Sequence, residues 1–294
     1  MKTTTLPFSI KYKKQHASRQ DIINFYDEAT EDYSFWSQDL NMHFGYFDFF
    51  RTNIFRRDTM LNAMNLRIYN RLQLNSGRQI VADLGCGMGG TMRHFLNRNE
   101  QLSMMGVTLS PFQVREGNKL LQDMKGVILQ ENYCDTSIAS ESMDGVIGIE
   151  SLCHSGHSKE SLAEGYRLLK PGGKMVVADA FLKKDPSKLC LGSSYSYKKL
   201  CQGWSLDGLG VISEVKQRLL DIGFKEVFIE DVSFRTAPSV LHVPFAILGF
   251  LLKHIWQGKT IKPQSWNNLK ASFFALLCGL HMLDFGYYII TATK

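Results

Sequence analysis

The chain of 294 residues is 44% apolar and 21% charged, which allows a large hydrophobic core and excludes a disordered chain. Its formal net charge of +6 is modest for this length, and no interleaving of basic and aromatic residues accompanies it, so nucleic acid is not the expected partner. An anionic substrate or a membrane surface is compatible with this charge. Six widely spaced cysteines without a C-x-x-C pair indicate free thiols in a reducing compartment.

The N-terminal part, residues 1–78, is rich in aromatic side chains and has a helical pattern, for example over Asp21–Tyr33 and Phe55–Leu74. It has no apolar core long enough for a signal peptide. The most apolar tracts of the chain, Phe245–Leu252 and Phe273–Leu283, are shorter than the roughly 20 residues that a membrane-spanning helix needs. We therefore expect a cytoplasmic protein and leave a peripheral membrane contact open.

Residues 79–232 alternate short β-branched runs with helical stretches, a pattern typical of a parallel α/β sheet. Ser110 and Ser158 each precede a helical stretch and are expected N-caps. The expected strands are Gln79–Leu84, Ser103–Thr108, Val127–Gln130, Gly145–Ile149, Lys174–Asp179 and Glu226–Asp231. The expected helices are Gly90–Asn99, Pro111–Met124, Lys159–Leu169 and Gly210–Asp221.

The C-terminal part changes texture again. Residues 237–283 are apolar and helical in pattern, interrupted by Pro244 and Pro263, and a strand pattern follows over Gly286–Thr293. A strand that arrives so late suits a Rossmann-like α/β fold, in which a seven-stranded, mostly parallel sheet has an antiparallel last strand. The expected parts are a helical N-terminal segment (1–78), a core (79–236 with 284–294) and a helical cap (237–283).

The segment from Asp83 to Gly90 (DLGCGMGG) follows an expected strand and opens an expected helix. Glycines suit a backbone that turns sharply and approaches a ligand closely. The spacing G-x-G-x-G-G differs from the G-x-G-x-x-G of dinucleotide sites, and the carboxylate of Asp83 suits a cationic amino-acid ligand and repels a pyrophosphate. A purely structural turn is the alternative. The predicted cofactor residues here are Asp83, Gly85, Cys86, Gly87, Gly89 and Gly90.

The next two strands offer the remaining nucleotide contacts. Many α/β nucleotide sites have an acid at the end of the second strand, but Thr108 stands there in this chain. Neutral groups of Thr108, Ser110 and Gln113, beside Leu109, would then hold the ribose; for Ser110 a pure helix cap is equally compatible. Asp135 follows the third strand and is placed to accept from an adenine amino group, with a solvated loop as the alternative.

These motifs resemble a known family. DLGCGMGG, GVTLSPFQ, Glu150 after MDGVIGI, and LLKPGGKMVVAD are together similar to the class I S-adenosylmethionine-dependent methyltransferases, and most to those that methylate carbon in sterols, tocopherols and prenyl diphosphates. The run T-L-S-x-x-Q is typical of that group. The aromatic segment that contains Tyr26, Tyr33 and Tyr46 resembles the N-terminal segment that folds over the cofactor in that family.

The resemblance implies S-adenosyl-L-methionine as cofactor and methyl transfer to a carbon, through a carbocation that later loses a proton. Glu150 lies at the carboxyl end of the fourth expected strand, where open α/β sheets bind ligands, and is the first candidate for the base or for a cofactor ligand. His154 is a second candidate base, and Tyr46 is a candidate to stabilise the cation. Cys153, His154 and His157 lack a fourth partner at a recognisable spacing, so no metal is expected.

The expected function is C-methylation of a lipophilic isoprenoid-type small molecule of the prenyl diphosphate, sterol or prenylquinol class. Arg51, Arg56 and Arg57 are candidates to pair with a diphosphate, with a solvated helix face as the simpler interpretation. The alternatives are O- or N-methylation of a small natural product and, more remotely, a non-catalytic cofactor-binding protein. A homodimer is left open.

Overall fold

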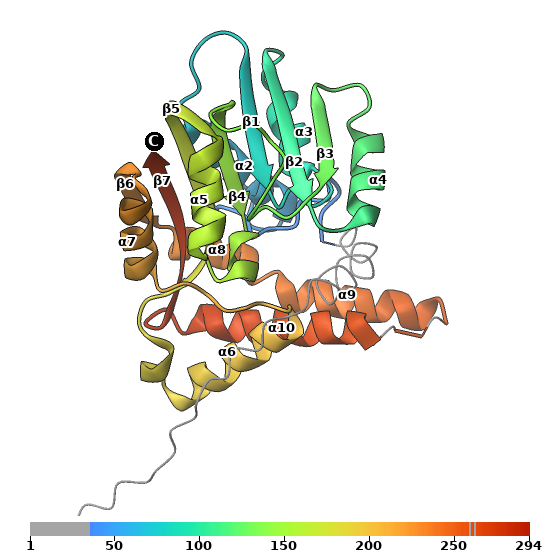
Figure 1. Ribbon diagram of the computed structural model, residues 1–294. Coiled ribbons are helices and arrows are strands. Elements are labelled where there is room, and N and C mark those ends of the chain that lie inside the picture. Colours follow the sequence, from blue (N-terminus) through green and yellow to red (C-terminus); the bar gives the residue numbers. More distant parts are fainter. Residues whose placement is uncertain (1–35, 259, 262) are drawn as a thin grey trace, which may run out of the picture.

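The computed structural model describes residues 36–258, 260–261 and 263–294; Tyr26, Tyr33 and the helix expected over Asp21–Tyr33 lie outside them. Seven strands form one sheet in the order β3-β2-β1-β4-β5-β7-β6 (Figure 1). The strands are β1 (Gln79–Leu84), β2 (Leu102–Thr108), β3 (Gly126–Gln130), β4 (Met143–Ile149), β5 (Leu169–Leu182), β6 (Lys225–Asp231) and β7 (Phe285–Thr293). Every expected strand is present, and the Rossmann-like prediction is confirmed.

The order of the strands fixes where a ligand can bind. Strands β1 to β5 pair in parallel, and β7 lies between β5 and β6, antiparallel to both. The chain runs outward from β1 through β2 to β3, then returns to place β4 on the other side of β1. Open α/β sheets bind ligands outside the carboxyl ends of the strands at such a reversal. The segments after β1 and β4 therefore face the expected site.

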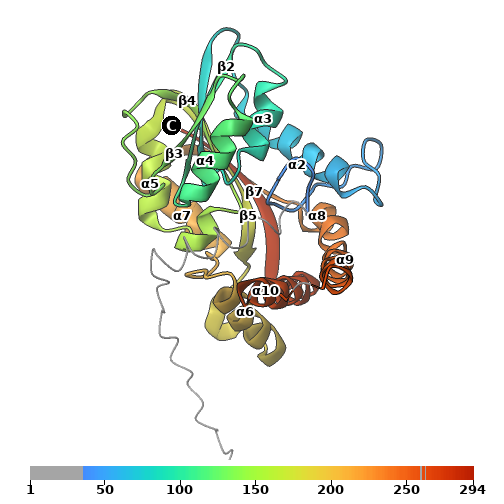
Figure 2. The ribbon, with the colours of Figure 1, turned by 90° about the vertical axis from the view of Figure 1, so that its right-hand side faces the viewer.

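Helices cover both faces of the sheet because its strands are buried on both sides. Helices α2 (Arg57–Leu72), α3 (Gly90–Leu96) and α4 (Pro111–Leu120) lie on one face, and α5 (Lys159–Leu168) and α7 (Ile212–Ile222) lie on the other (Figure 2). The expected N-caps are confirmed, since the hydroxyls of Ser110 and Ser158 accept from the backbone N–H groups of Gln113 and Ser161 at 3.1 and 3.2 Å.

A helical cap lies across the carboxyl ends of the parallel strands (Figure 1). It consists of α6 (Leu191–Gly203), α8 (Ser233–Val240), α9 (Val243–Trp256) and α10 (Pro263–Leu280). Pro244 lies in the first turn of α9 and Pro263 begins α10, so these prolines start helices rather than interrupt them. Helix α6 was not expected; it packs along α10, and the indole N–H of Trp204 donates to Asn268 Oδ1 at 2.8 Å.

The cap contains an apolar helical segment that is longer than the sequence predicted. The run Ser233–Trp256 comprises α8, a two-residue turn and α9, and it contains an 18-residue window with a mean hydropathy of 1.4, of which 17% is buried. By length and composition alone this run could cross a membrane. Judging the tract Phe245–Leu252 by itself missed this, because α8 and α9 follow each other almost without a break. The inner side of the run nevertheless packs against the rest of the protein, with Val243 and Phe250 buried.

Candidate active site

A cavity of about 630 Å³ lies between the carboxyl ends of the strands and the cap. Its walls come from the glycine loop after β1, the segments after β2, β3 and β4, the N-terminal segment at 36–44, and the cap helices. The glycine loop is held against β2, since the N–H groups of Gly85 and Cys86 both donate to Val107 O at 3.0 Å. One cavity therefore joins the predicted cofactor site to the apolar cap.

The glycines of the loop are required at their positions for different structural reasons. Gly85 has φ +93°, and a Cβ there would lie 2.4 Å from the Cβ of Ser151; a Cβ on Gly90 would lie 2.8 Å from Asn41 Oδ1. Gly87 has φ +55° and lines the cavity. Gly89 is not among the residues that line the cavity: it caps α3 and faces the core residue Ile128, so its cofactor contact stays a prediction. The loop serves chain packing as much as ligand approach.

This gives a stability prediction. We expect Gly85→Ala to lower the free energy of unfolding by about 2–4 kcal/mol, because a left-handed backbone and a clash with Ser151 act together. The matched control is Gly77→Ala, where φ is +104° but nothing lies within 4 Å, so only the backbone cost of about 1 kcal/mol remains. Urea unfolding of both variants measures the difference; equal losses would contradict the assignment to Ser151.

At the end of β2, the predicted ribose residues divide into two groups. Thr108, Leu109 and Gln113 line the cavity, and the Thr108 hydroxyl donates to Gln113 Oε1 at 2.6 Å. Ser110 is fully buried and does not line the cavity. Its hydroxyl caps α4, which confirms the helix-cap interpretation, while the cofactor contact of Ser110 stays a prediction.

The residue predicted to bind the adenine lies outside the cavity wall. Asp135 is exposed and is not among the residues that line the cavity; a tight turn brings its N–H to Asn132 O at 3.0 Å. Asn132, Tyr133 and Cys134 line the cavity instead. The role predicted for Asp135 stays a prediction, and the amide of Asn132, three residues earlier, is a second candidate that does line the cavity.

The N-terminal segment forms part of the cavity wall, as expected, through Trp36 and residues 40–44. Phe44 packs edge-on against Trp36 with ring centroids 5.8 Å apart. Tyr46 is not part of the wall: its ring lies under the guanidinium of Arg67 at 4.6 Å, and its N–H donates to Met60 O. The catalytic role predicted for Tyr46 finds no support in this position, because its backbone is hydrogen-bonded to α2 and its ring packs on Arg67.

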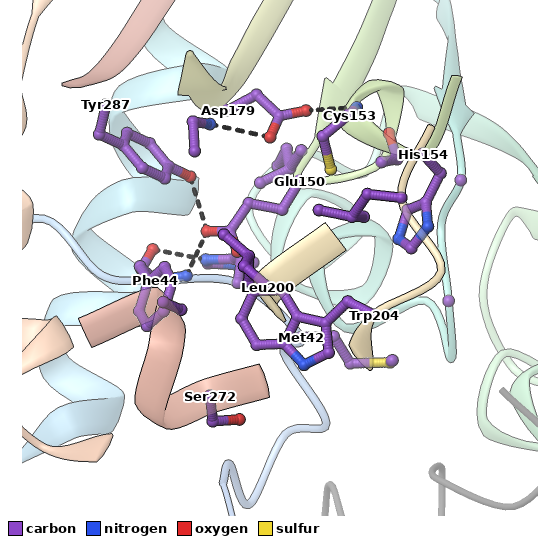
Figure 3. A pocket seen from close by; sticks show the side chains of 18 of the residues that line it. Met42, Phe44, Glu150, Cys153, His154, Asp179, Leu200, Trp204, Ser272 and Tyr287 are labelled. Carbon is purple, nitrogen blue, oxygen red and sulfur yellow. Dashed lines mark hydrogen bonds between the residues drawn. The ribbon is translucent and has the colours of Figure 1, made fainter. Parts of the chain in front are cut away.

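Glu150 is the acid at the centre of the cavity (Figure 3). It follows β4 with φ +47°, a strained backbone conformation for a residue with a side chain. Its Oε1 accepts from the N–H of Phe44 at 2.5 Å and from the hydroxyl of Tyr287 at 2.8 Å. Burial, reinforced by the nearby carboxylate of Asp179, raises the pKa of Glu150 to about 8 against these two donors. The carboxyl is poised to change protonation near neutral pH.

Two further groups stand behind Glu150. Asp179, at 1% exposure, accepts from the N–H groups of Cys153 and Ala180 at 3.0 and 2.8 Å and lies 3.2 Å from His157 Nε2. His157 Nδ1 accepts from Gly210 N–H, so the proton sits on Nε2, toward Asp179. The sequence prediction missed Asp179; its place at the end of β5, beside Glu150 at the end of β4, was the available signal.

His154 lines the cavity, and burial lowers the pKa of its imidazole, so it is neutral at pH 7. His157 is not among the residues that line the cavity; its ring stacks on Phe181 with ring centroids 4.2 Å apart. In the part of the chain that the structure describes, no group of three or more His, Cys, Asp or Glu side chains is arranged to hold a metal ion.

The family model for a methyltransferase domain matches residues 82–177, the stretch from β1 to β5 that builds the cofactor end of the cavity. Residues 82–177 therefore form a methyltransferase domain, and the sheet around it has the fold of class I S-adenosylmethionine-dependent methyltransferases. It is 27% identical to sterol methyltransferase-like 1 of Botryococcus braunii over 77% of this chain and 58% of that protein. It is 26% identical to the 2-methyl-6-phytyl-1,4-hydroquinone methyltransferase of Synechocystis sp. over 85% of this chain and 77% of that protein.

The chain therefore spans little more than half the length of the Botryococcus relative. Among solved structures, the cyclopropane synthase MmaA2 of Mycobacterium tuberculosis has the same fold, with a TM-score of 0.78 and 17% identity over 96% of this chain and 100% of that one. Other solved structures of this fold hold S-adenosylmethionine or S-adenosylhomocysteine. S-adenosylmethionine is the cofactor of the methyltransferase domain.

The charges of the cavity fit this cofactor. Asp83 is 3% exposed, and burial raises its pKa to about 7. Four carboxyl groups line the cavity, from Asp83, Glu150, Asp179 and Asp207, whereas no Lys or Arg among the described residues does. S-adenosylmethionine carries a sulfonium and an ammonium group, and these positive charges can pair with the carboxylates of the cavity. Asp83, beside Gly85 and Gly87, is the residue of the methyltransferase domain best placed to hold the ammonium.

Proposed function

We propose that this chain transfers the methyl group of S-adenosylmethionine to a carbon atom of a lipophilic isoprenoid-type acceptor, with Glu150 as the base. The observation that carries the proposal is the position of Glu150, where the cofactor end of the cavity meets its apolar cap end (Figure 3). Sterol and prenylquinol methyltransferases among the relatives support this choice.

The cofactor, when bound, supplies an electrophilic methyl group. An alkene of the acceptor forms the new carbon–carbon bond with its π electrons as the carbon–sulfur bond breaks, which leaves a carbocation on the acceptor. Aromatic faces of Trp36, Phe44 and Tyr287 line this part of the cavity and can stabilise such a cation by about 2 kcal/mol each when desolvated. Ionised Glu150 then removes a proton from the adjacent carbon, which restores an alkene. The cap excludes water that would trap the cation.

The charges of the cavity also favour one acceptor class. A prenyl diphosphate would carry its negative charges into a cavity with four carboxyl groups and, among the described residues, no Lys or Arg. Arg51 and Arg56, candidates to hold a diphosphate, are exposed away from the cavity wall, and the guanidinium of Arg57 lies over the ring of Trp36 at 4.3 Å. An uncharged acceptor of the sterol or prenylquinol class is the better fit.

One alternative rests on a specific observation. His154 lines the same cavity as a neutral imidazole, because burial lowers its pKa. It could take a proton from a phenol and direct the methyl group to oxygen instead of carbon. This O-methylation needs no carbocation and no role for Glu150.

The test uses the purified chain, methyl-labelled S-adenosylmethionine and four acceptors: a prenyl diphosphate, a sterol, a prenylquinol and a simple phenol. Mass spectrometry and NMR then locate the label. We expect label on a carbon of the sterol or the prenylquinol. Label only on oxygen or nitrogen would overturn C-methylation, and cofactor binding without transfer to any acceptor would favour a non-catalytic protein.

A second prediction concerns the pH profile. In Tyr287→Phe, the carboxylate of Glu150 loses one hydrogen-bond donor. Because that donor stabilises the ionised form, the pKa of Glu150 should rise above its present value of about 8. The base is active when ionised, so the rising limb of kcat/KM should move to higher pH. Activity should be lower at pH 7 and recover toward the wild-type value at alkaline pH. A uniform loss at every pH would point to a packing role for Tyr287 instead.

A further inference from the structure

The outer face of α9 carries a continuous row of apolar side chains, which we call the α9 stripe. Its members recur every three or four residues and therefore lie on one side of the helix. They are between 55% and 88% exposed: Phe245, Leu248, Leu252, Ile255 and Trp256. The inner side of the same helix is also apolar, with Val243 and Phe250 buried. A helix that is apolar on all sides is normally covered on all sides.

A neighbouring loop extends this surface. Residues 48–56, which we call the aromatic loop, expose Phe49, Phe50 and Phe55 at 71%, 99% and 87%. The ring of His242, between α8 and α9, is bonded to Ile54 O at 2.6 Å, so the loop is joined to the start of α9. Figure 2 shows the loop, α8 and α9 on the same side of the molecule.

The exposed charged side chains on this surface are basic: Arg51 and Arg56 in the aromatic loop and Lys253 in α9. The one acid of the loop, Asp48, is half-buried, and its carboxylate accepts from the N–H of Phe50 at 3.0 Å. The sequence has no Asp or Glu within residues 233–258. An apolar surface with a predominantly basic border matches the acyl chains and anionic headgroups of a lipid bilayer. We propose that the α9 stripe and the aromatic loop dock peripherally on an anionic phospholipid membrane.

Several contacts support lying on the membrane rather than crossing it. The hydroxyl of Ser239 accepts from Gly45 N–H at 2.8 Å, and that of Ser233 accepts from Tyr287 N–H at 2.9 Å. Ala246 and Ile247 form part of the cavity wall. A bilayer-spanning arrangement of residues 233–256 would break these bonds and open the cavity, whereas interfacial docking buries only the outer side that is now exposed.

Docking in this way has a functional consequence that does not depend on which acceptor is used. One face of α9 would contact lipid while the other lines the cavity, so a single helix separates the bilayer from the site of reaction. A lipophilic acceptor could then leave the membrane for the cavity without crossing bulk water.

The test is sedimentation of the full chain with phosphatidylcholine vesicles that contain or lack phosphatidylglycerol. We expect binding to the anionic vesicles, weakening as salt is added. Arg51→Glu combined with Arg56→Glu should weaken binding by at least about tenfold. Phe245→Glu combined with Ile255→Glu should weaken it at least as much. Leu220→Glu, at a residue of α7 that is 43% exposed outside the α9 stripe and the aromatic loop, is the matched control and should bind as wild type.

None of the altered residues lines the cavity, so all variants should keep the wild-type affinity for S-adenosylmethionine, which separates lost docking from misfolding. No binding of the intact chain to anionic vesicles would overturn the proposal, as would binding that the substitutions leave unchanged. A dimer that Phe245→Glu with Ile255→Glu dissociates, without any vesicle binding, would assign the α9 stripe to a second copy of this chain and likewise overturn it. Each outcome leaves the proposed chemistry untouched.

Discussion

Replacing Glu150 by Gln is expected to reduce kcat by between about 10²- and 10⁴-fold, the contribution typical of a positioned general base. Gln fills the same volume and keeps an oxygen for the N–H of Phe44 and the hydroxyl of Tyr287, so the local fold should survive. It cannot take up the proton that must leave the acceptor. The loss should therefore appear in turnover, with cofactor affinity close to that of wild type.

The pH dependence gives a sharper form of this test. The pKa of Glu150 is raised to about 8, and the base works when ionised, so kcat/KM of the wild type should rise with pH through about 8. The bound sulfonium favours the ionised form, so the corresponding rise in kcat should lie at lower pH. The Gln variant should lose this rise. Glu116 in α4, a half-buried acid outside the cavity wall, offers the control Glu116→Gln. Wild-type turnover in Glu150→Gln would remove Glu150 from the mechanism.

Replacing Asp83 by Asn is expected to raise the Kd for S-adenosylmethionine by about 10²- to 10⁴-fold. Removing one partner of a buried ion pair costs about 3–5 kcal/mol, and each 1.4 kcal/mol is tenfold in affinity. Because burial raises the pKa of Asp83 to about 7 and the ammonium prefers the ionised carboxylate, wild-type affinity should increase with pH through about 7. Isothermal titration calorimetry at several pH values measures both effects, with exposed Asp123→Asn as the control.

Stability separates this ligand role from a structural one. A carboxyl whose pKa is raised in the folded protein disfavours folding above its unfolded pKa near 4, increasingly until the pH passes about 7. The cofactor-free Asn variant should therefore be at least as stable as wild type at pH 8 in urea unfolding. A variant that loses stability together with affinity would indicate that Asp83 is mainly a structural residue.

The central part of the site could be predicted because topology determines it. Strand periodicity located β1 and β4, and the rule that ligands bind at carboxyl ends then placed Asp83 and Glu150 at one cavity. The partner of Glu150 could not be found in this way. Tyr287 lies 137 residues further along the chain, and only the antiparallel insertion of β7 brings it within hydrogen-bond distance.

The sequence was least informative in irregular segments, where the backbone direction over one or two residues decides which side chain lines the cavity. Asp135 and Asn132 belong to the same turn, yet only Asn132 lines the cavity. Phe44 and Tyr46 are two residues apart in an irregular segment, and only Phe44 reaches Glu150. Neither strand alternation nor helical periodicity applies to such segments, so the sequence could supply the right region and not the right side chain.

Helix α6 was missed for a different physical reason. Its buried residues are mostly small or polar, with Ser193 and Ser196 beside Tyr197 and Leu200, so it lacks the apolar stripe that predicts a helix. Its stability comes from packing along α10, a contact between segments far apart in sequence. Tertiary packing of this kind leaves little trace in the local pattern.

The position of β7 between β5 and β6 also has a consequence for how the protein is made. When Asp231 leaves the ribosome, β5 can already pair with β4, but the other edge of β5 and the whole of β6 lack their partner until Phe285 and the residues after it are synthesised. At typical translation rates this interval lasts about 3–10 s, during which the apolar cap is emerging as well. The nascent chain then exposes two unpaired strand edges and an apolar segment at the same time. We therefore expect chaperones to protect it from aggregation mainly during this period.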